Sequence, residues 1–365
     1  ERRGYDRAYG MTDAEFHRFQ AQYPLWERSH YYSDPENMTG AIECYTPTTT
    51  PVGADVHRDE NKDGTEDECK GVTDVLGIGG SQCDEFEQKC TLPYRARVVK
   101  PMPWYVTNGS DLRFFVPTQY ATHQWDAALR SAVVTAQYTE CMAVETASDS
   151  ADLATAKAKC AAENPVYFGQ ADANDDLIFL SQEMDDCRND LKVNGASVFN
   201  ISGAVGSDER ETACKQRVAQ RGAQLEAEDG VIKQAQMPEV VTLCHSPVQI
   251  DDPPMCGTAE QRLQVNPEDN TQLTAEICNS ARAAGNRTVV ALCQQALNVR
   301  LGDLRYHTVN LIETPQTPSP WGIMVSSIDP MNGETVSTSV NVWTYVNDFW
   351  AQRVVDWMRY AAGEI

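Results

Sequence analysis

Twelve cysteines constrain the fold of this chain more than any other feature of its sequence. Their number is even and none of them forms a C-x-x-C motif, so neither a zinc ribbon nor a thioredoxin-like redox site is indicated. We therefore interpret all of them as disulfide-bonded, which places the chain in an oxidising environment, outside the cell or on its surface. The predicted disulfide cysteines are Cys44, Cys69, Cys83, Cys90, Cys141, Cys160, Cys187, Cys214, Cys244, Cys256, Cys278 and Cys293.

The pairing of these cysteines does not follow from the sequence itself, because many connectivities are open to twelve of them. Pairing between sequence neighbours closes short local loops, and we adopt it as a hypothesis. It gives the bridges 44–69, 83–90, 141–160, 187–214, 244–256 and 278–293. Each bridge would stabilise the fold by about 2–4 kcal/mol, because it restricts the unfolded chain.

An acidic loop that leads to Cys69 has the spacing of a calcium-binding loop. Oxygen-bearing side chains occupy loop positions 1, 3, 5 and 9, Gly64 occupies position 6, and position 7 offers a backbone carbonyl. The candidate calcium ligands, in that order, are Asp59, Asn61, Asp63, Asp67 and Thr65. Lys70 stands where an EF-hand needs a bidentate Glu, so the loop more closely resembles those of thrombospondin type 3 repeats. A solvated acidic loop without a metal is the alternative.

The charge of the chain excludes some partners. There are 30 basic and 53 acidic residues, a net charge of −23, and phosphate-rich partners need a basic face. We therefore expect neither nucleic acid nor an anionic membrane as a partner, whereas cations are favoured. No apolar run approaches the ~20 residues of a membrane span, so none is predicted. The polar opening Glu1-Arg2-Arg3-Gly4 leads us to expect an exported chain whose leader has been removed.

The segment Asp303–Trp343 reads as three strands. Asn332-Gly333 can adopt the positive φ angles of a two-residue type I′ turn, which predicts a hairpin. After it, Val336, Thr338, Val340 and Val342 fall on one face of an alternating, half-buried strand. The spacing over 348–362 predicts a helix with one apolar face, formed by Phe349, Val354, Val355, Met358 and Ala362.

Helical spacing dominates the middle of the chain. A helix is predicted from about Thr118, with an apolar stripe formed by Ala121, Trp125, Leu129, Val133 and Ala136. Further helices are predicted over 151–162, 177–191, 208–236 and 273–301. Because cysteines recur on these helices, we predict helical hairpins that disulfides hold together in place of a deep core.

Two blocks of sequence, roughly a hundred residues together, resemble a known enzyme family. One block has the pattern D-x-R-Y followed by G-x-x-x-S-x-x-D-P-x-x-G-E, and the other has W-[ND]-x-A-[LF]. The matching residues are Asp303, Arg305, Tyr306, Gly322, Ser326, Asp329, Pro330, Gly333, Glu334, Trp125, Asp126, Ala128 and Leu129. These patterns resemble the part of large secreted bacterial zinc-dependent metalloproteases, of the metzincin kind, that precedes their zinc helix.

The resemblance implies an α+β fold, a metzincin-like mixed sheet with packed helices that is interrupted by a disulfide-stapled helical insertion. It divides the chain into four parts. Residues 1–95 form an N-terminal wrapping segment with the calcium-type loop, and 96–145 the first half of the metzincin-like domain. Residues 146–300 form the disulfide-rich insertion, and 301–365 the sheet hairpin and the following helix.

The catalytic signature of that family, H-E-x-x-H on a helix, is absent. None of the six histidines begins this motif. The resemblance therefore implies the N-terminal portion of a peptide-hydrolysing enzyme, with zinc ligands supplied downstream or by a partner polypeptide. In that family an edge strand of the sheet pairs with the substrate peptide, and Trp321–Ser327 and Val336–Trp343 are both candidates for it. The alternative is a secreted, calcium-stabilised, disulfide-rich structural or adhesive protein without catalysis.

Overall fold

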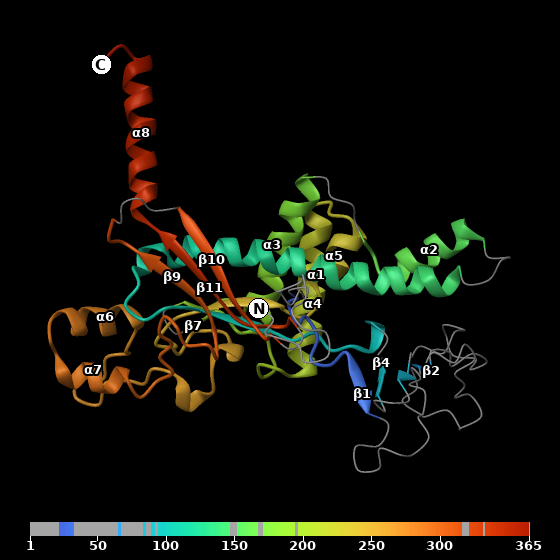
Figure 1. Cartoon of the computed structure of the whole chain (residues 1–365), viewed down its shortest axis with the longest axis horizontal. Helices are drawn as coiled ribbons and strands as arrows, with labels where there is room; N and C mark the ends of the chain where they lie inside the picture. Colours follow the sequence, from blue (N-terminus) through green and yellow to red (C-terminus); the bar gives the residue numbers. More distant parts are fainter. Residues whose placement is uncertain are drawn as a thin grey trace, which may run out of the picture.

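The computed structural model describes residues 22–32, 65–66, 83–84, 89–91, 94–146, 152–166, 171–193, 196–315, 321–330 and 333–364. Over these residues the fold is mixed α/β, with a five-stranded sheet and eight α-helices (Figure 1). The mixed sheet and packed helices that the sequence predicts are therefore present. No helix in the described ranges is both long and apolar enough to cross a membrane.

The main sheet has the strand order β10-β11-β9-β5-β8. Its strands are β5 (Met102–Val106), β8 (Val241–Cys244), β9 (His307–Ile312), β10 (Gly322–Ile328) and β11 (Thr335–Trp343). The neighbouring pairs among β11, β9, β5 and β8 are parallel, and β10 alone runs antiparallel to its neighbour β11. The predicted hairpin is thus present, and Gly333 has a φ of 80° in its turn. Asn332 lies outside the described residues.

Helices connect the strands. They are α1 (Phe115–Glu145), α2 (Leu153–Glu163), α3 (Ala171–Arg188), α4 (Asp208–Gln224), α5 (Asp229–Ala235), α6 (Ala275–Ala283), α7 (Arg287–Cys293) and α8 (Tyr345–Ala361). The helices predicted over 208–236 and 273–301 are each divided in two. Glu226 (φ 56°) interrupts the first and Gly285 (φ 69°) the second, because a positive φ cannot continue a right-handed helix.

Short elements complete the described fold. A small antiparallel sheet of order β1-β4-β3-β2 contains β1 (His30–Tyr32), β2 (Thr65–Glu66), β3 (Cys83–Asp84) and β4 (Lys89–Thr91). A two-stranded ladder joins β6 (Lys192–Val193) to β7 (Ala196–Ser197). Single 3₁₀ turns span Tyr94–Ala96, Leu112–Phe114, Pro254–Cys256 and Ala259–Gln261.

The main sheet is covered on both faces. On one face, Val106, Leu243 and Val309 pack against Phe115 at the start of α1. On the other, Tyr105 packs against Val248, Cys256 and Val299 of the segment that follows β8. A separate core, which includes Leu177, Leu180, Met184, Val218 and Val231, lies among α3, α4 and α5.

Four disulfides join neighbouring elements in the pairing that the sequence analysis proposed. Cys141–Cys160 links α1 to α2, Cys187–Cys214 links α3 to α4, Cys244–Cys256 links β8 to the following turn, and Cys278–Cys293 links α6 to α7. In the small sheet, Cys83 and Cys90 are paired residues of β3 and β4. Cys44 and Cys69 lie outside the described residues.

Three predictions need correction. The apolar stripe predicted for α1 is only partly right: Val133 is buried, but Trp125 is 67% exposed and Ala121 is also exposed, whereas Asp126 and Arg130 are buried. The alternation predicted for β11 is wrong at its start, because Val336 is 55% exposed whereas Thr335 and Ser337 on the opposite face are buried. In addition, the region 146–300 is not wholly an insertion beside the sheet. Its residues Val241–Cys244 form β8, which pairs in parallel with β5.

Candidate functional site

The strand β10 forms one edge of the main sheet, and β11 lies inside, between β10 and β9. Of the two segments considered for a substrate-edge strand, the one within Trp321–Ser327 therefore provides an edge, and the one within Val336–Trp343 does not. In the part of the chain that the structure describes, no strand pairs with the outer side of β10. An edge of this kind presents backbone N–H and C=O groups to which another extended chain can bind.

The first half of β10 is exposed on both of its faces. Trp321 is 63% exposed and Met324 62%, and Ile323 and Val325 are exposed as well. Since successive side chains of a strand point to opposite faces, a run of four exposed residues means that neither face is covered there. Large apolar side chains on a bare edge are typical of a surface that contacts another polypeptide.

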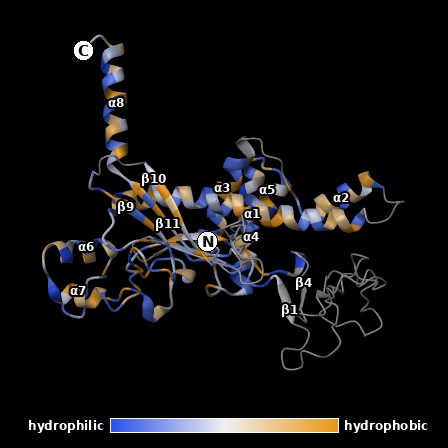
Figure 2. Cartoon of the chain, viewed as in Figure 1, coloured by the Kyte–Doolittle hydropathy of each residue, from blue (hydrophilic) through white to orange (hydrophobic). Residues whose placement is uncertain are grey.

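The helix α8 extends this exposed surface. It projects away from the rest of the fold, and Figure 2 shows hydrophobic residues along it. Trp350 in its first turns makes an edge-to-face contact with Trp321, with ring centroids 5.3 Å apart. Beyond this contact, Phe349, Val354 and Met358 are exposed. The predicted helix is therefore confirmed, and only Val346 of its described residues is buried, so most of its apolar side chains are exposed.

We name this region the β10–α8 surface. Its members are the large apolar side chains exposed on the start of β10 and along α8: Trp321, Ile323, Met324, Val325, Phe349, Val354, Val355, Trp357, Met358 and Tyr360. The acidic and basic residues of α8, among them Asp348 and Arg353, lie between them in the sequence. Arg353 lies 5.5 Å from the ring centroid of Trp350 and contributes its cation to the face of that ring.

The residues that carry the family resemblance have local structural roles. Backbone groups of Asp329 close the turn before β11: its N–H donates to Glu334 O and its C=O accepts from Gly333, each at 2.8 Å. Asp303 precedes β9 and binds Arg305, with Nη2 and Oδ2 2.7 Å apart, which lowers the pKa of the Asp303 carboxyl. The strand itself begins only at His307. The motif residues therefore stabilise the turn between β10 and β11 and the segment that leads into β9.

Asp126, the acidic residue of the W-[ND]-x-A-[LF] pattern, ties α1 to the opposite edge of the sheet. Its Oδ1 accepts hydrogen bonds from the backbone N–H groups of Val240 at 2.7 Å and Val241 at 3.0 Å. Its Oδ2 binds Arg130 Nε at 2.6 Å. A buried carboxylate with these partners is a structural anchor, because each of its oxygens already has a donor.

The sequence analysis does not predict the buried charge network around Arg130. The i, i+4 spacing of Asp126 and Arg130 is the one sequence signal that indicates an ion pair there. Arg130 is fully buried and also pairs with Asp185 of α3. Its Nη1 donates to the carbonyls of Ala235 and Met237, each at 2.7 Å. Burial alone would lower the pKa of Arg130, but Asp185 and Asp126 raise it above its ordinary value. The network therefore remains charged and joins α1, α3 and α5.

Glu239 lies beside this network. Burial, together with the negative charges of Asp185 and Asp126, raises the pKa of the Glu239 carboxyl to about 8. Asn189 Nδ2 donates to its Oε2 at 3.1 Å. The Glu239 carboxyl therefore takes up a proton more readily than a free glutamate does, which limits the negative charge that the network must hold.

The predicted calcium ligands Asp59, Asn61, Asp63 and Asp67 lie outside the described residues. Thr65 begins β2, where it pairs with Asp84. Within the residues that the structure describes, no group of three or more His, Cys, Asp or Glu side chains is placed to hold a metal ion. His245 binds Asp252 through Nδ1 at 2.7 Å, and His307 Nδ1 accepts from the backbone of Thr338 at 3.1 Å.

No known protein family, curated protein or solved structure matches this chain.

Proposed function

We propose that the chain is the N-terminal portion of a secreted zinc metalloprotease of the metzincin kind, and that β10 binds the substrate peptide as an added antiparallel strand. The observation that carries this proposal is the open, apolar edge of β10. Main-chain hydrogen bonds along an edge supply affinity in strand addition, and contacts with alternate side chains supply selectivity. The exposed side chains of Ile323, Met324 and Val325 favour extended, apolar segments of protein substrates.

The zinc-binding helix would come from a further segment of the polypeptide or from a partner polypeptide. The family resemblance places that helix after the hairpin, and this chain has no H-E-x-x-H motif. The β10–α8 surface is a part of the described fold whose large apolar side chains are exposed. A segment packed against the start of α8 would lie next to β10. The zinc site has to be there, because it must reach the substrate peptide bound along β10. Zinc, when bound by such a segment, would activate the attacking water.

Secretion is part of the same proposal. Four disulfides on successive elements support an oxidising compartment, in which such bridges persist. The predicted calcium loop would then stabilise the N-terminal segment outside the cell, where calcium is abundant.

Peptides with selective backbone methylation test the role of β10. An extended apolar peptide should bind the chain and change the fluorescence of Trp321. Methylation of alternate peptide amides should abolish binding in one register, because those N–H groups would pair with β10, and should be tolerated in the other register. Equal tolerance of methylation at every position would contradict strand addition.

The catalytic part of the proposal is tested on the secreted protein. Culture medium should yield this chain together with sequence that contains an H-E-x-x-H motif, and the purified material should hydrolyse casein until a zinc chelator is added. Recovery of the chain without such sequence, and without any hydrolysis, would instead favour the structural or adhesive alternative.

A further inference from the structure

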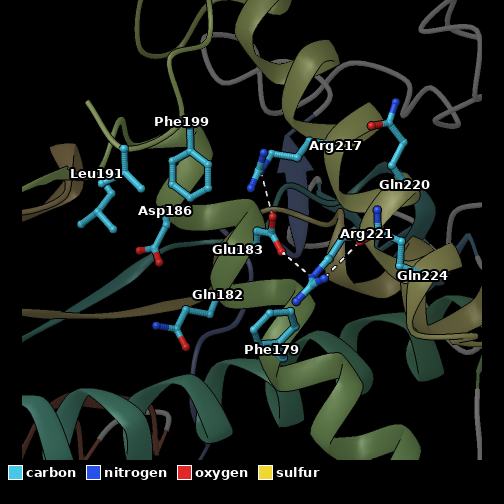
Figure 3. A pocket seen from close by; sticks show the side chains of 11 residues that line it. Phe179, Gln182, Glu183, Asp186, Leu191, Phe199, Arg217, Gln220, Arg221 and Gln224 are labelled. Atoms are coloured by element: carbon cyan, nitrogen blue, oxygen red, sulfur yellow. Dashed lines mark hydrogen bonds and ion pairs between the residues drawn. The ribbon is translucent and has the colours of Figure 1, made fainter. Parts of the chain in front are cut away.

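A cavity of about 550 Å³ opens in the helical region, between α3, α4 and the residues that flank the β6–β7 ladder (Figure 3). Leu191, Val198 and Phe199 give it an apolar wall. Phe179 and three glutamine side chains complete its lining together with four charged residues. A volume of this size is within the range of small-molecule sites, in which an apolar wall holds the body of a ligand and a few polar groups orient it.

Both arginines in the cavity already have partners. Arg217 Nε lies 2.8 Å from Glu183 Oε1, and Arg221 Nε lies 3.8 Å from Glu183 Oε2. Arg221 Nη1 also donates to Gln224 at 3.0 Å. Each guanidinium lies over an aromatic ring, Arg217 over Phe199 and Arg221 over Phe179. The positive charge of the cavity is therefore held by Glu183 and the aromatic faces.

The carboxylate of Asp186 has no such partner. Within the described residues, no side chain or backbone group donates a hydrogen bond to it, although its backbone carbonyl accepts from Leu191. Figure 3 shows the Asp186 carboxylate pointing away from both arginines. Its charged neighbours on α3 are Asp185 and Glu183, both acidic, and Arg130 and Arg188 both bind Asp185 rather than Asp186.

The chemistry of this carboxyl group agrees with that geometry. Burial, followed by the charges of Asp185 and Glu183, raises the pKa of Asp186 to about 7. An incoming cation would relieve this repulsion and would favour the ionised carboxylate. An ammonium group suits the place, because it brings three hydrogen-bond donors to a carboxylate that has none.

We propose that this cavity binds a small organic ammonium ion, a primary amine on an apolar body, with the ammonium group at Asp186 and the body against Leu191, Val198 and Phe199. An anion is disfavoured, because Glu183 occupies the two arginines and Asp186 would repel it. This proposal does not depend on the protease assignment, since the cavity is lined by residues of α3 and α4 and by residues that flank the β6–β7 ladder.

Titration with benzylammonium, followed by NMR shifts or calorimetry, tests the site, with benzyl alcohol and benzoate as the neutral and anionic counterparts. At pH 8 benzylammonium should bind at least about tenfold more tightly than either, as expected for a hydrogen bond between charged groups. Asp186→Asn should remove this advantage. Asp175→Asn, an exposed acidic residue on the same helix, is the matched control and should leave it intact.

The pH dependence of the unmodified protein provides an independent readout. Because the pKa of Asp186 is about 7, its ionised fraction falls between pH 8 and pH 5.5, and affinity for benzylammonium should fall by about thirtyfold. Benzoate binding that depends on Arg217, an unchanged affinity between these pH values, or an equal loss in the Asp175→Asn variant would each overturn the proposal.

Discussion

Replacement of Arg130 with methionine is expected to destabilise the fold strongly, because it removes the cation from a buried charge network. The change deletes the ion pairs with Asp126 and Asp185 and two hydrogen bonds to the carbonyls of Ala235 and Met237. Removal of one partner from a buried ion pair typically costs about 3–5 kcal/mol. Here the remaining groups keep some partners: Asp126 retains two backbone N–H donors, and Asp185 retains Arg188 at 2.9 Å. We therefore expect a loss of about 3 kcal/mol in the free energy of unfolding.

Urea denaturation followed by circular dichroism, without reductant, measures this loss. The loss of stability should be largest at pH 7.5 and smaller at pH 5.5, because the Asp185 carboxyl, left without Arg130, can then take up a proton. Burial already raises the pKa of Asp185 to about 6 despite Arg130, and removal of the arginine would raise it further. Arg113→Met is the control: that side chain is 79% exposed, and its pairing with Asp111 should contribute little. An Arg130→Met variant as stable as the control, or one that loses more stability at pH 5.5 than at pH 7.5, would refute the reasoning.

Three further measurements address other parts of the chain. The pKa of Glu239 is raised to about 8 in the folded state, from about 4.5 in the unfolded chain. Between pH 4.5 and pH 8 the folded protein therefore holds a proton that the unfolded chain has released, so the free energy of unfolding falls as the pH rises through this range. Glu239→Gln should reduce the slope by on the order of 1.4 kcal/mol per pH unit, and urea titrations from pH 5 to pH 9 that show the same slope in the variant would contradict it. Joint replacement of Cys244 and Cys256 by alanine should cost about 2–4 kcal/mol and lower the melting temperature, and an unchanged melting temperature would argue against the bridge. Calorimetry should detect calcium binding with a Kd of about 10⁻⁴–10⁻³ M that Asp63→Asn removes, whereas no heat at millimolar calcium would leave the acidic loop without a metal.

Local signals in the sequence predicted the features that depend on local structure. Cysteines that are close in the sequence were expected to pair, and the four bridges of the described region close loops of 12 to 27 residues in that way. The β10–β11 hairpin is predicted by its Asn-Gly turn, whereas the alternation predicted for β11 is not observed, since Val336 is exposed and Thr335 and Ser337 are buried. These local signals do not predict elements whose structure depends on segments that are distant in the sequence. The four residues of β8 are buried on both faces, so no alternation marks them as a strand.

The failure at α1 has the same cause. Apolar spacing placed Trp125 in the core, but the face of α1 that contacts the rest of the fold meets Asp185 of α3 and the N–H groups that precede and begin β8. Those partners are charged or polar, and they lie 55 or more residues away in the chain. The buried face of α1 therefore combines apolar residues such as Val133 and Val134 with Asp126 and Arg130, whose partners the composition of α1 does not reveal. Likewise, β10 could be placed at the edge only once β9 was seen to pair with β11.

The two edges of the main sheet differ in a way that bears on the function of β10. At the β8 edge all four strand residues are buried, Asp126 accepts the hydrogen bonds of Val240 and Val241, and Cys244 is cross-linked to Cys256. Proteins commonly cover, charge or shorten edge strands to prevent unwanted pairing, and the β8 edge has this protection. The β10 edge has seven residues, four of which are exposed. None of these four residues is charged, so this edge lacks the charges that discourage strand pairing. Since the described part of the fold protects one edge and leaves the other open, the open edge supports the proposal that β10 contacts another polypeptide.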